Sequence, residues 1–255
     1  MRATLAIARR ELEQYFATPM GWLCLCGFVL VTGFFFALMT TDYSVQASQS
    51  AFNPYMQEEM NVNDWLVQPF FANTAVILLL LCPALSMRLF AEDRRQRSLE
   101  LLLSSPIGSG QIVLGKYLGA LGFLAVLLFG TLHYSLILYW LGAPDPGILA
   151  ANYLGTFLLA AAFLAVGMLT SAFTESQVVA LVVSFGLLLG LWVLSWADSL
   201  APASWGGVLA HVSMLSHMEQ LSKGLLHVED VTYYLTFVGF FLFATWQRVE
   251  AWRWQ

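Results

Sequence analysis

The stretch QVVALVVSFGLLLGLWVLSW, residues 177–196, has no charged side chain, and such stretches decide the class of fold. A helix rising 1.5 Å per residue needs about 20 apolar residues to cross a hydrocarbon core of roughly 30 Å. A shorter stretch, 231–247, is dense in Phe, Leu and Tyr. Six transmembrane helices are therefore predicted, near 20–41, 69–88, 116–141, 151–173, 177–196 and 231–247.

The composition of the whole chain agrees with this prediction. Of 255 residues, 59% are hydrophobic and only 11% are charged, against roughly 25% charged in soluble domains. The mean hydropathy is +0.71. We therefore predict an all-α polytopic membrane protein with one domain over residues 1–255. A disordered chain, a disulfide scaffold and a nucleic-acid-binding domain are excluded, and Cys24, Cys26 and Cys82 are interpreted as small buried hydrophobes.

The positions of Lys and Arg predict the orientation of the chain. With six spans, every Lys and Arg except Lys223 falls on one side, in the N-terminal tail, the loop 88–116 and the C-terminal tail. This side is the cytoplasm by the positive-inside rule. We expect a multi-pass protein of the bacterial inner membrane with both termini cytoplasmic. The polar segment 197–230 then lies on the outer side, with its charge-free part packed at the surface in re-entrant fashion.

The one match to a nucleotide-binding motif is interpreted as a coincidence. Residues Gly110 to Lys116 fit the start of a phosphate-binding loop, but Tyr117 replaces the Ser or Thr that holds magnesium. No strand precedes the motif. Gly115, Gly119 and Gly122 are instead expected to let the third span approach a neighbouring helix closely.

Groups that could catalyse a reaction inside the membrane are not evident. No span has an acidic or basic residue at its centre, so neither a proton relay nor a carboxylate pair is predicted. His133 is interpreted as an inward-facing side chain bonded to a backbone carbonyl or a neighbouring helix. His211, His217 and His227 lack carboxylates at metal spacing. We therefore expect a non-enzymatic chain with no cofactor or metal of its own.

The N-terminal segment 1–19 is predicted to be an amphipathic helix in the membrane interface. Leu5, Ala8, Leu12 and Phe16 recur at helical spacing, and the charged residues Arg9, Arg10, Glu11 and Glu13 lie on the other sides. Pro19 and Gly21 then allow the chain to turn before the first span.

The loop 88–116 carries a charge cluster, Glu92 to Arg97, before a leucine stripe. A short helix is predicted from Ser98, with Leu99, Leu102 and Leu103 on one face, ending before Pro106. An apolar stripe on a water-exposed loop must be buried against another surface. Two partners remain open: lipid headgroups, or a groove on a cytoplasmic protein.

Several motifs together resemble a known family. They are the opening Ala6-Ile-Ala-Arg-Arg-Glu-Leu12 with Tyr15 and Thr18-Pro19, the run Met87 to Pro106 with Ile112 to Lys116, the turn Thr174-Glu-Ser-Gln177, and Ser216 to Gly224 with Asp230-Val. The chain resembles permease subunits of ABC-2 type transporters over essentially its full length. The last pair is most similar to the gliding-motility branch.

The resemblance implies an ABC-2 (type V exporter-like) transmembrane domain with an N-terminal interfacial helix. It also implies a second permease, identical or homologous, and two separate ATPase subunits that bind ATP and magnesium. Besides membrane lipid, a periplasmic accessory protein is a further partner to consider. The residues implied to couple to the ATPase are Glu92, Asp93, Arg94, Arg95, Arg97, Ser98, Leu99, Glu100, Leu102 and Leu103.

Two functions stay open at this point. The first is a permease subunit that exports or moves a substrate using the energy of ATP hydrolysis. The alternative is a non-transporting module that transmits ATPase movements mechanically to a periplasmic partner. A passive channel is disfavoured because the second and fifth spans are almost uniformly apolar.

Overall fold

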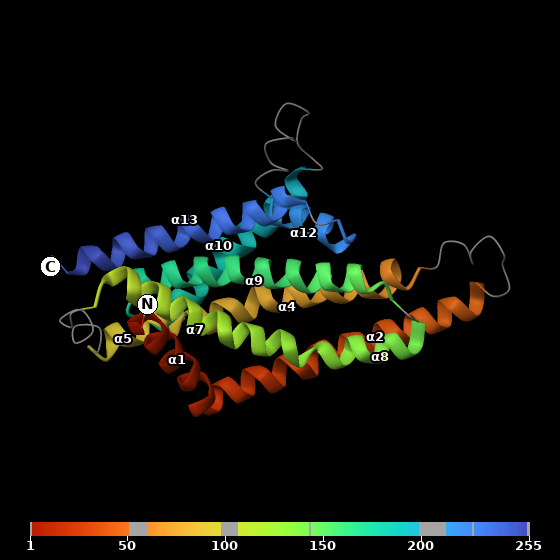
Figure 1. The fold of residues 1–255 in the computed structure, drawn as a ribbon, viewed down its shortest axis with the longest axis horizontal. Helices are drawn as coiled ribbons and strands as arrows, with labels where there is room; N and C mark the ends of the chain where they lie inside the picture. The colour runs from red at the N-terminus through yellow and green to blue at the C-terminus, as the bar shows by residue number, and fades with distance from the viewer. Residues whose placement is uncertain are drawn as a thin grey trace.

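The computed structural model describes residues 2–50, 61–97, 107–142, 144–198, 213–225 and 227–253. These residues form helices, and the described ranges contain no strand (Figure 1). The elements in chain order are α1 (Arg2–Ala17), α2 (Pro19–Ser50), the π-helical turn η1 (Asn63–Val67), α4 (Gln68–Ser86), α5 (Arg88–Arg95), α7 (Ser109–Gly130), α8 (Leu132–Gly142), α9 (Pro146–Phe173), α10 (Gln177–Asp198), α12 (Met214–Ser222) and α13 (Val228–Trp252).

Five helical segments of the described chain are long and apolar enough to cross a membrane. Each of the first five predicted spans falls on one of them: Pro19–Gln49, Asn63–Arg95, Ser109–Trp140, Pro146–Phe173 and Gln177–Leu194. The sixth predicted span falls on α13. That helix has 25 residues, but charged side chains lie near both of its ends, so its apolar stretch is short.

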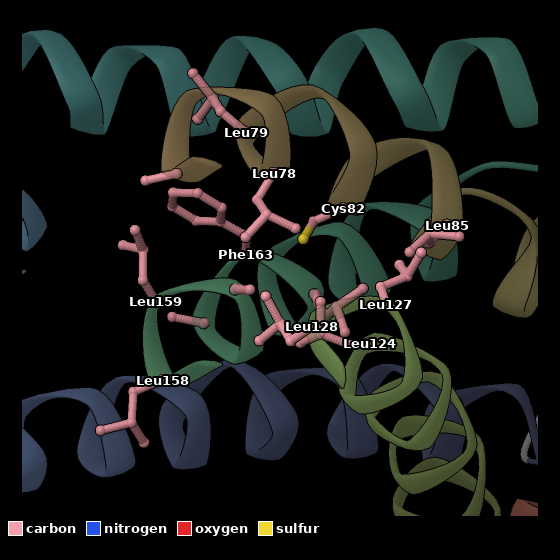
Figure 2. Close-up of a cluster of buried hydrophobic side chains, with 14 of the residues drawn as sticks. Leu78, Leu79, Cys82, Leu85, Leu124, Leu127, Leu128, Leu158, Leu159 and Phe163 are labelled. Carbon is pink, nitrogen blue, oxygen red and sulfur yellow. The ribbon is translucent and has the colours of Figure 1, made fainter. Parts of the chain in front are cut away.

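The centre of the bundle is α9. In its most apolar stretch 83% of the residues are buried, against 22% in α2 and 17% in α10. Figure 2 shows how α9 meets its neighbours: Leu159 and Phe163 lie among leucines of α4 and α7. Small side chains let the helices approach, since a Cβ on Gly167 would collide with Ser86 of α4. The outer helices α2 and α10 leave most of their apolar surface uncovered.

The cysteines divide between core and surface. Cys24 and Cys82 are buried, as predicted, and the Cys82 thiol lies in the core between α4 and its neighbours (Figure 2). Cys26 is exposed on α2, so the prediction of a buried side chain is wrong there. All three are free.

Two features of the loop 88–116 differ from the sequence prediction. Its charge cluster is itself helical, as α5, and continues from α4 after a single turn residue, Met87. The third span begins at Ser109, so Lys116 lies inside α7 rather than in a loop. The predicted leucine helix from Ser98 lies outside the described residues.

Both termini and α5 lie toward one end of the bundle, and the C-terminal end of α2 lies at the other (Figure 1). Helix α1 crosses this first end at an angle to α2 (Figure 1). The bend between the two helices is at Thr18, just before Pro19, where the sequence predicted an interruption. The predicted outer segment 197–230 contains the short helix α12, which packs on α9. Asn152 of α9 donates to the carbonyl of Ser222 at its end (3.0 Å).

Candidate functional site

The start of α5 is held by a side chain from α9. Ser171 Oγ accepts hydrogen bonds from the amides of Phe90 (3.1 Å) and Ala91 (3.0 Å) and donates to the carbonyl of Met87 (2.8 Å). The first amides of a helix have no partner within the helix, and a serine oxygen is a preferred cap. Here the cap comes from a different helix, so it fixes where α5 begins and also where α5 lies on the core.

A buried charge cluster joins α5 to two other helices. The Lys116 ammonium on α7 lies 2.5 Å from Glu11 Oε1 on α1 and 2.8 Å from Asp93 Oδ2 on α5. The three side chains are 3%, 11% and 17% exposed, respectively. Burying charges without a partner is costly. The position of each carboxylate is therefore set by the same lysine.

The packing of α1 corrects the predicted setting of one of its charged side chains, Glu11. Glu11 and Tyr15 are its buried residues, whereas Leu5 is 65% exposed. The sequence predicts Leu5 on the apolar face in the membrane interface and Glu11 on a polar side, and only the burial of Glu11 differs from that prediction. The reason is the pairing with Lys116, which turns Glu11 toward α7. Because Leu5 faces away from the bundle, it is free to contact lipid.

Glycines on α7 allow this close contact. A Cβ added at Gly115 would lie 2.7 Å from Ile7 Cβ, and one at Gly119 would lie 2.6 Å from Glu11 Cβ. The prediction that these glycines permit close helix approach is confirmed, and the neighbour is α1. Residues Gly110 to Lys116 form regular helix within α7. Their match to a phosphate-binding loop is therefore misleading.

Tyr15 anchors the C-terminal end of α1. Its hydroxyl donates to the carbonyl of Leu85 (3.0 Å), and its ring stacks on Phe123 (centroids 4.5 Å apart). The guanidinium of Arg88, the first residue of α5, lies 3.9 Å from the centroid of the Tyr15 ring. Burial raises the pKa of Tyr15, although the charge of Arg88 opposes the rise. The hydroxyl therefore stays protonated and keeps its hydrogen bond.

The outward face of α5 is basic. Arg95, Gln96 and Arg97 are exposed. The helix ends at Arg95 with Gln96 as its C-cap, and Arg97 then has a φ of 55°, the left-handed conformation common just after a helix. Arg94 donates to Glu175, which lies in the turn between α9 and α10 (2.8 Å). Its guanidinium also lies 4.9 Å from the ring of Trp252 on α13. This face is the part of α5 available to a partner.

Residues at the C-terminal end of α13 and just after it bind the chain around the start of α7. Ser109 Oγ donates to Glu250 and accepts from Trp246 Nε1 (2.9 Å), and Arg253 donates to the carbonyl of Ile107 (3.2 Å). The segment between α5 and α7 is thus anchored at both ends. At its N-terminal side, α5 contacts α7 and α9 directly and is linked to α1 through Lys116. At its C-terminal side, Ile107 and Ser109 contact residues at the end of α13.

Some of the predicted coupling residues can be placed and others cannot. Asp93 and Arg94 make the contacts above, Glu92 accepts from Gln96 (3.0 Å), and Arg95 and Arg97 are exposed. Ser98, Leu99, Glu100, Leu102 and Leu103 lie outside the described residues. Sequence reasoning missed Glu11, Lys116 and Ser171. Of these three, only Lys116 has a local signal in the sequence: it is a single charged residue between Gly115 and Gly119 in an otherwise apolar stretch.

The histidines differ from their predicted settings. His133 is exposed on α8, not inward-facing, although its ring nitrogen does contact the carbonyl of Gly130 (2.6 Å) as expected. His217 pairs with Asp230 (2.6 Å) beside a cavity of about 690 Å³ between α12 and α13, a contact the sequence did not predict. His211 lies outside the described residues. Within the described ranges, no group of three or more metal-binding side chains converges.

The fold and site define a polytopic helical membrane protein with a charged, helix-anchored segment at one end. A family model described as "ABC-2 family transporter protein" matches residues 5–249, so the chain belongs to that family. It is therefore a permease-type membrane component of an ABC transporter, in a family whose members associate with ABC ATPases and are not themselves the catalytic subunit. Among curated proteins, no sequence matches closely enough to count as a relative.

Proposed function

We propose that this chain is a permease subunit that pairs with a second permease and with two ATPase subunits to export or move a substrate. ATP and magnesium bind to the ATPases. The observation that carries the proposal is the anchoring of the segment 88–109 at both of its described ends, because a force that a partner applies to this segment would reach the core through those contacts. Membership of the gliding-motility branch is part of the proposal and rests on Ser216 to Gly224 with Asp230.

The orientation proposed is six spans, with α13 as the sixth and both termini in the cytoplasm of a bacterium. Two observations support it. Lys and Arg gather in the segments predicted to be cytoplasmic, and α5 and the two termini share one end of the bundle (Figure 1). The uncovered apolar faces of α2 and α10 leave room for lipid and for a second permease.

Docking on the ATPase is tested at the leucine stripe. If Leu99 and Leu103 fill a groove on the ATPase, truncation removes burial worth roughly 1.5–3 kcal/mol per side chain. The variant Leu99→Ala/Leu103→Ala should then bind the ATPase well over tenfold more weakly, since about 1.4 kcal/mol is a factor of ten. The measurement is co-purification of the ATPase with each variant at matched permease levels.

The control for this test is Leu118→Ala on α7, because Leu118 is 44% exposed and, two residues after Lys116, lies on the opposite face of α7 from the ion pair with Asp93. Leu124 would be a poor control, since it is fully buried in the core and its truncation would destabilise the fold. Wild-type recovery of the ATPase by the double variant would show that the stripe is not the docking element and would favour lipid headgroups as its partner.

Hydrolysis is proposed to reside in the partner. The purified chain should show no ATP turnover above a protein-free blank, because Gly110 to Lys116 form regular helix within α7 rather than a loop that could wrap a phosphate, and Tyr117 replaces the Ser or Thr that holds magnesium. Adding the cognate ATPase should restore turnover. Appreciable hydrolysis by the isolated chain would contradict the assignment.

A further inference from the structure

The cluster of Lys116, Glu11 and Asp93 is unusual in its position. One ammonium and two carboxylates are nearly shielded from water, and each comes from a different helix. The three helices are also different in kind: α1 precedes the first span, α5 opens the anchored segment, and α7 belongs to a membrane-crossing segment. No two of the three charged groups are neighbours along the chain.

Stability alone does not explain such a cluster. Removing charges from water is expensive, and well-packed apolar residues of similar size often stabilise a fold at least as well as a buried ion pair. What a buried ion pair does provide is a single geometry, because any displacement of one partner leaves the others unpaired. The same position also carries glycines that bring α1 against α7, so the helices meet closely where the charges fix their register.

We propose that Lys116 is a positioning residue that makes α1, α5 and the start of α7 move as one body. This inference rests on the proposed function. When the ATPase displaces α5, the paired charges transmit the displacement to α7 through Asp93 and to α1 through Glu11. Ser171 and α13 hold the segment on the bundle, while Lys116 couples the movement of α5 to α1 and α7.

The matched control is present on α1 itself. Arg9 and Glu13 form an ion pair of similar length (2.7 Å), but both side chains are well exposed. An exposed pair of this kind contributes little. Arg9→Met therefore removes one positive charge from the same helix system without touching the buried cluster, whereas Lys116→Met removes the shared charge and keeps the length of the side chain.

The experiment is hydrogen–deuterium exchange on the full-length chain in lipid nanodiscs, first alone and then bound to its ATPase. In the chain alone, Lys116→Met should raise amide exchange in both α1 and α5 by about tenfold or more, as expected when a local tertiary restraint is lost. Exchange in α9 should not change. Lys116→Arg, which keeps the charge, and Arg9→Met should both behave like the wild type.

The second arm compares the ATPase complex with and without ATP and vanadate. In the wild type, trapping should change exchange in α5, α1 and the first turns of α7 together. In Lys116→Met the change should be confined to α5. This readout separates positioning from a general loss of stability, which would affect all helices with or without nucleotide.

Two results would overturn the inference. One is unchanged exchange of α1 and α5 in the Lys116→Met chain alone. The other is a nucleotide response in Lys116→Met that still reaches α1 and α7. A wild-type complex with no nucleotide response in any helix would be a different failure, because it would overturn the proposed coupling to an ATPase and this inference with it.

Discussion

Single glycines on α7 set how closely α1 can approach the bundle, and with it whether Glu11 can reach Lys116. Beyond Gly115, a Cβ at Gly119 would lie 2.8 Å from the carbonyl oxygen of Ala8. A backbone atom cannot rotate away as a side chain can, so the whole of α1 would have to move. Gly122 is less constrained, since its nearest neighbours are the flexible ends of Leu12 at 3.5 Å.

We therefore expect Gly119→Ala to destabilise the chain. Replacing glycine by alanine within a helix gains about 1 kcal/mol in propensity, but overpacking typically costs about 1–3 kcal/mol, and the contact here is with backbone. The thermal midpoint in detergent should fall. The same substitution at Gly186, which has no atom within 4 Å of the added Cβ, should leave the midpoint unchanged or raise it. An equal response at both positions would contradict the packing described for α1 and α7.

At the scale of elements, the short helix α5 depends on tertiary contacts. It has eight residues, and isolated helices shorter than about 12–15 residues are marginal in water. Its stability comes from Ser171 at one end, Lys116 on one face and Arg94 against α13. An element held in this way is positioned by its neighbours, which suits a segment that receives force from a partner.

Loss of the Ser171 hydroxyl should loosen α5. In Ser171→Ala the amides of Phe90 and Ala91 lose their buried acceptor, at a cost of about 1–3 kcal/mol. Amide exchange in α5 should accelerate roughly tenfold or more, while α9 keeps its protection. The matched control is Ser184→Ala on α10, where a buried hydroxyl donates to the carbonyl of Leu181 within its own helix. If both variants leave α5 protected, Ser171 is not its cap.

At the scale of the whole molecule, the arrangement predicts which segments share a side of the membrane. In a chain whose three native cysteines are replaced by alanine, single cysteines can be placed at exposed positions. Gln49→Cys and Lys223→Cys should react with a membrane-impermeant maleimide in spheroplasts. Gln96→Cys and Ala251→Cys should react only in inverted vesicles.

The pair Lys223→Cys and Ala251→Cys tests α13, because Lys223 precedes that helix and Ala251 lies in its last turn. Labelling from opposite sides would establish a sixth crossing. Labelling of both from the same side would mean that α13 does not cross, and the six-span orientation would be wrong.

Much of the architecture could be predicted because membranes impose a simple rule on sequence. Helices that cross lipid must be long and apolar, so the charge-free stretches around 20–41, 69–88 and 151–173 were sufficient to place helices. The asymmetry of Lys and Arg predicted which loops belong together. The motifs that resemble ABC-2 permeases pointed to the family that the match over residues 5–249 shows.

Tertiary structure decided what charge and periodicity could not. The pattern of Leu5, Ala8, Leu12 and Phe16 described a helix with an apolar face but could not show that Glu11 is turned inward, because the group that offsets its burial, Lys116, is 105 residues away. Ser171 belongs to no motif in the sequence, and its hydroxyl caps a different helix. Pairings between distant residues leave no local signal, so only the packed bundle showed that α1, α5 and α7 meet at one lysine.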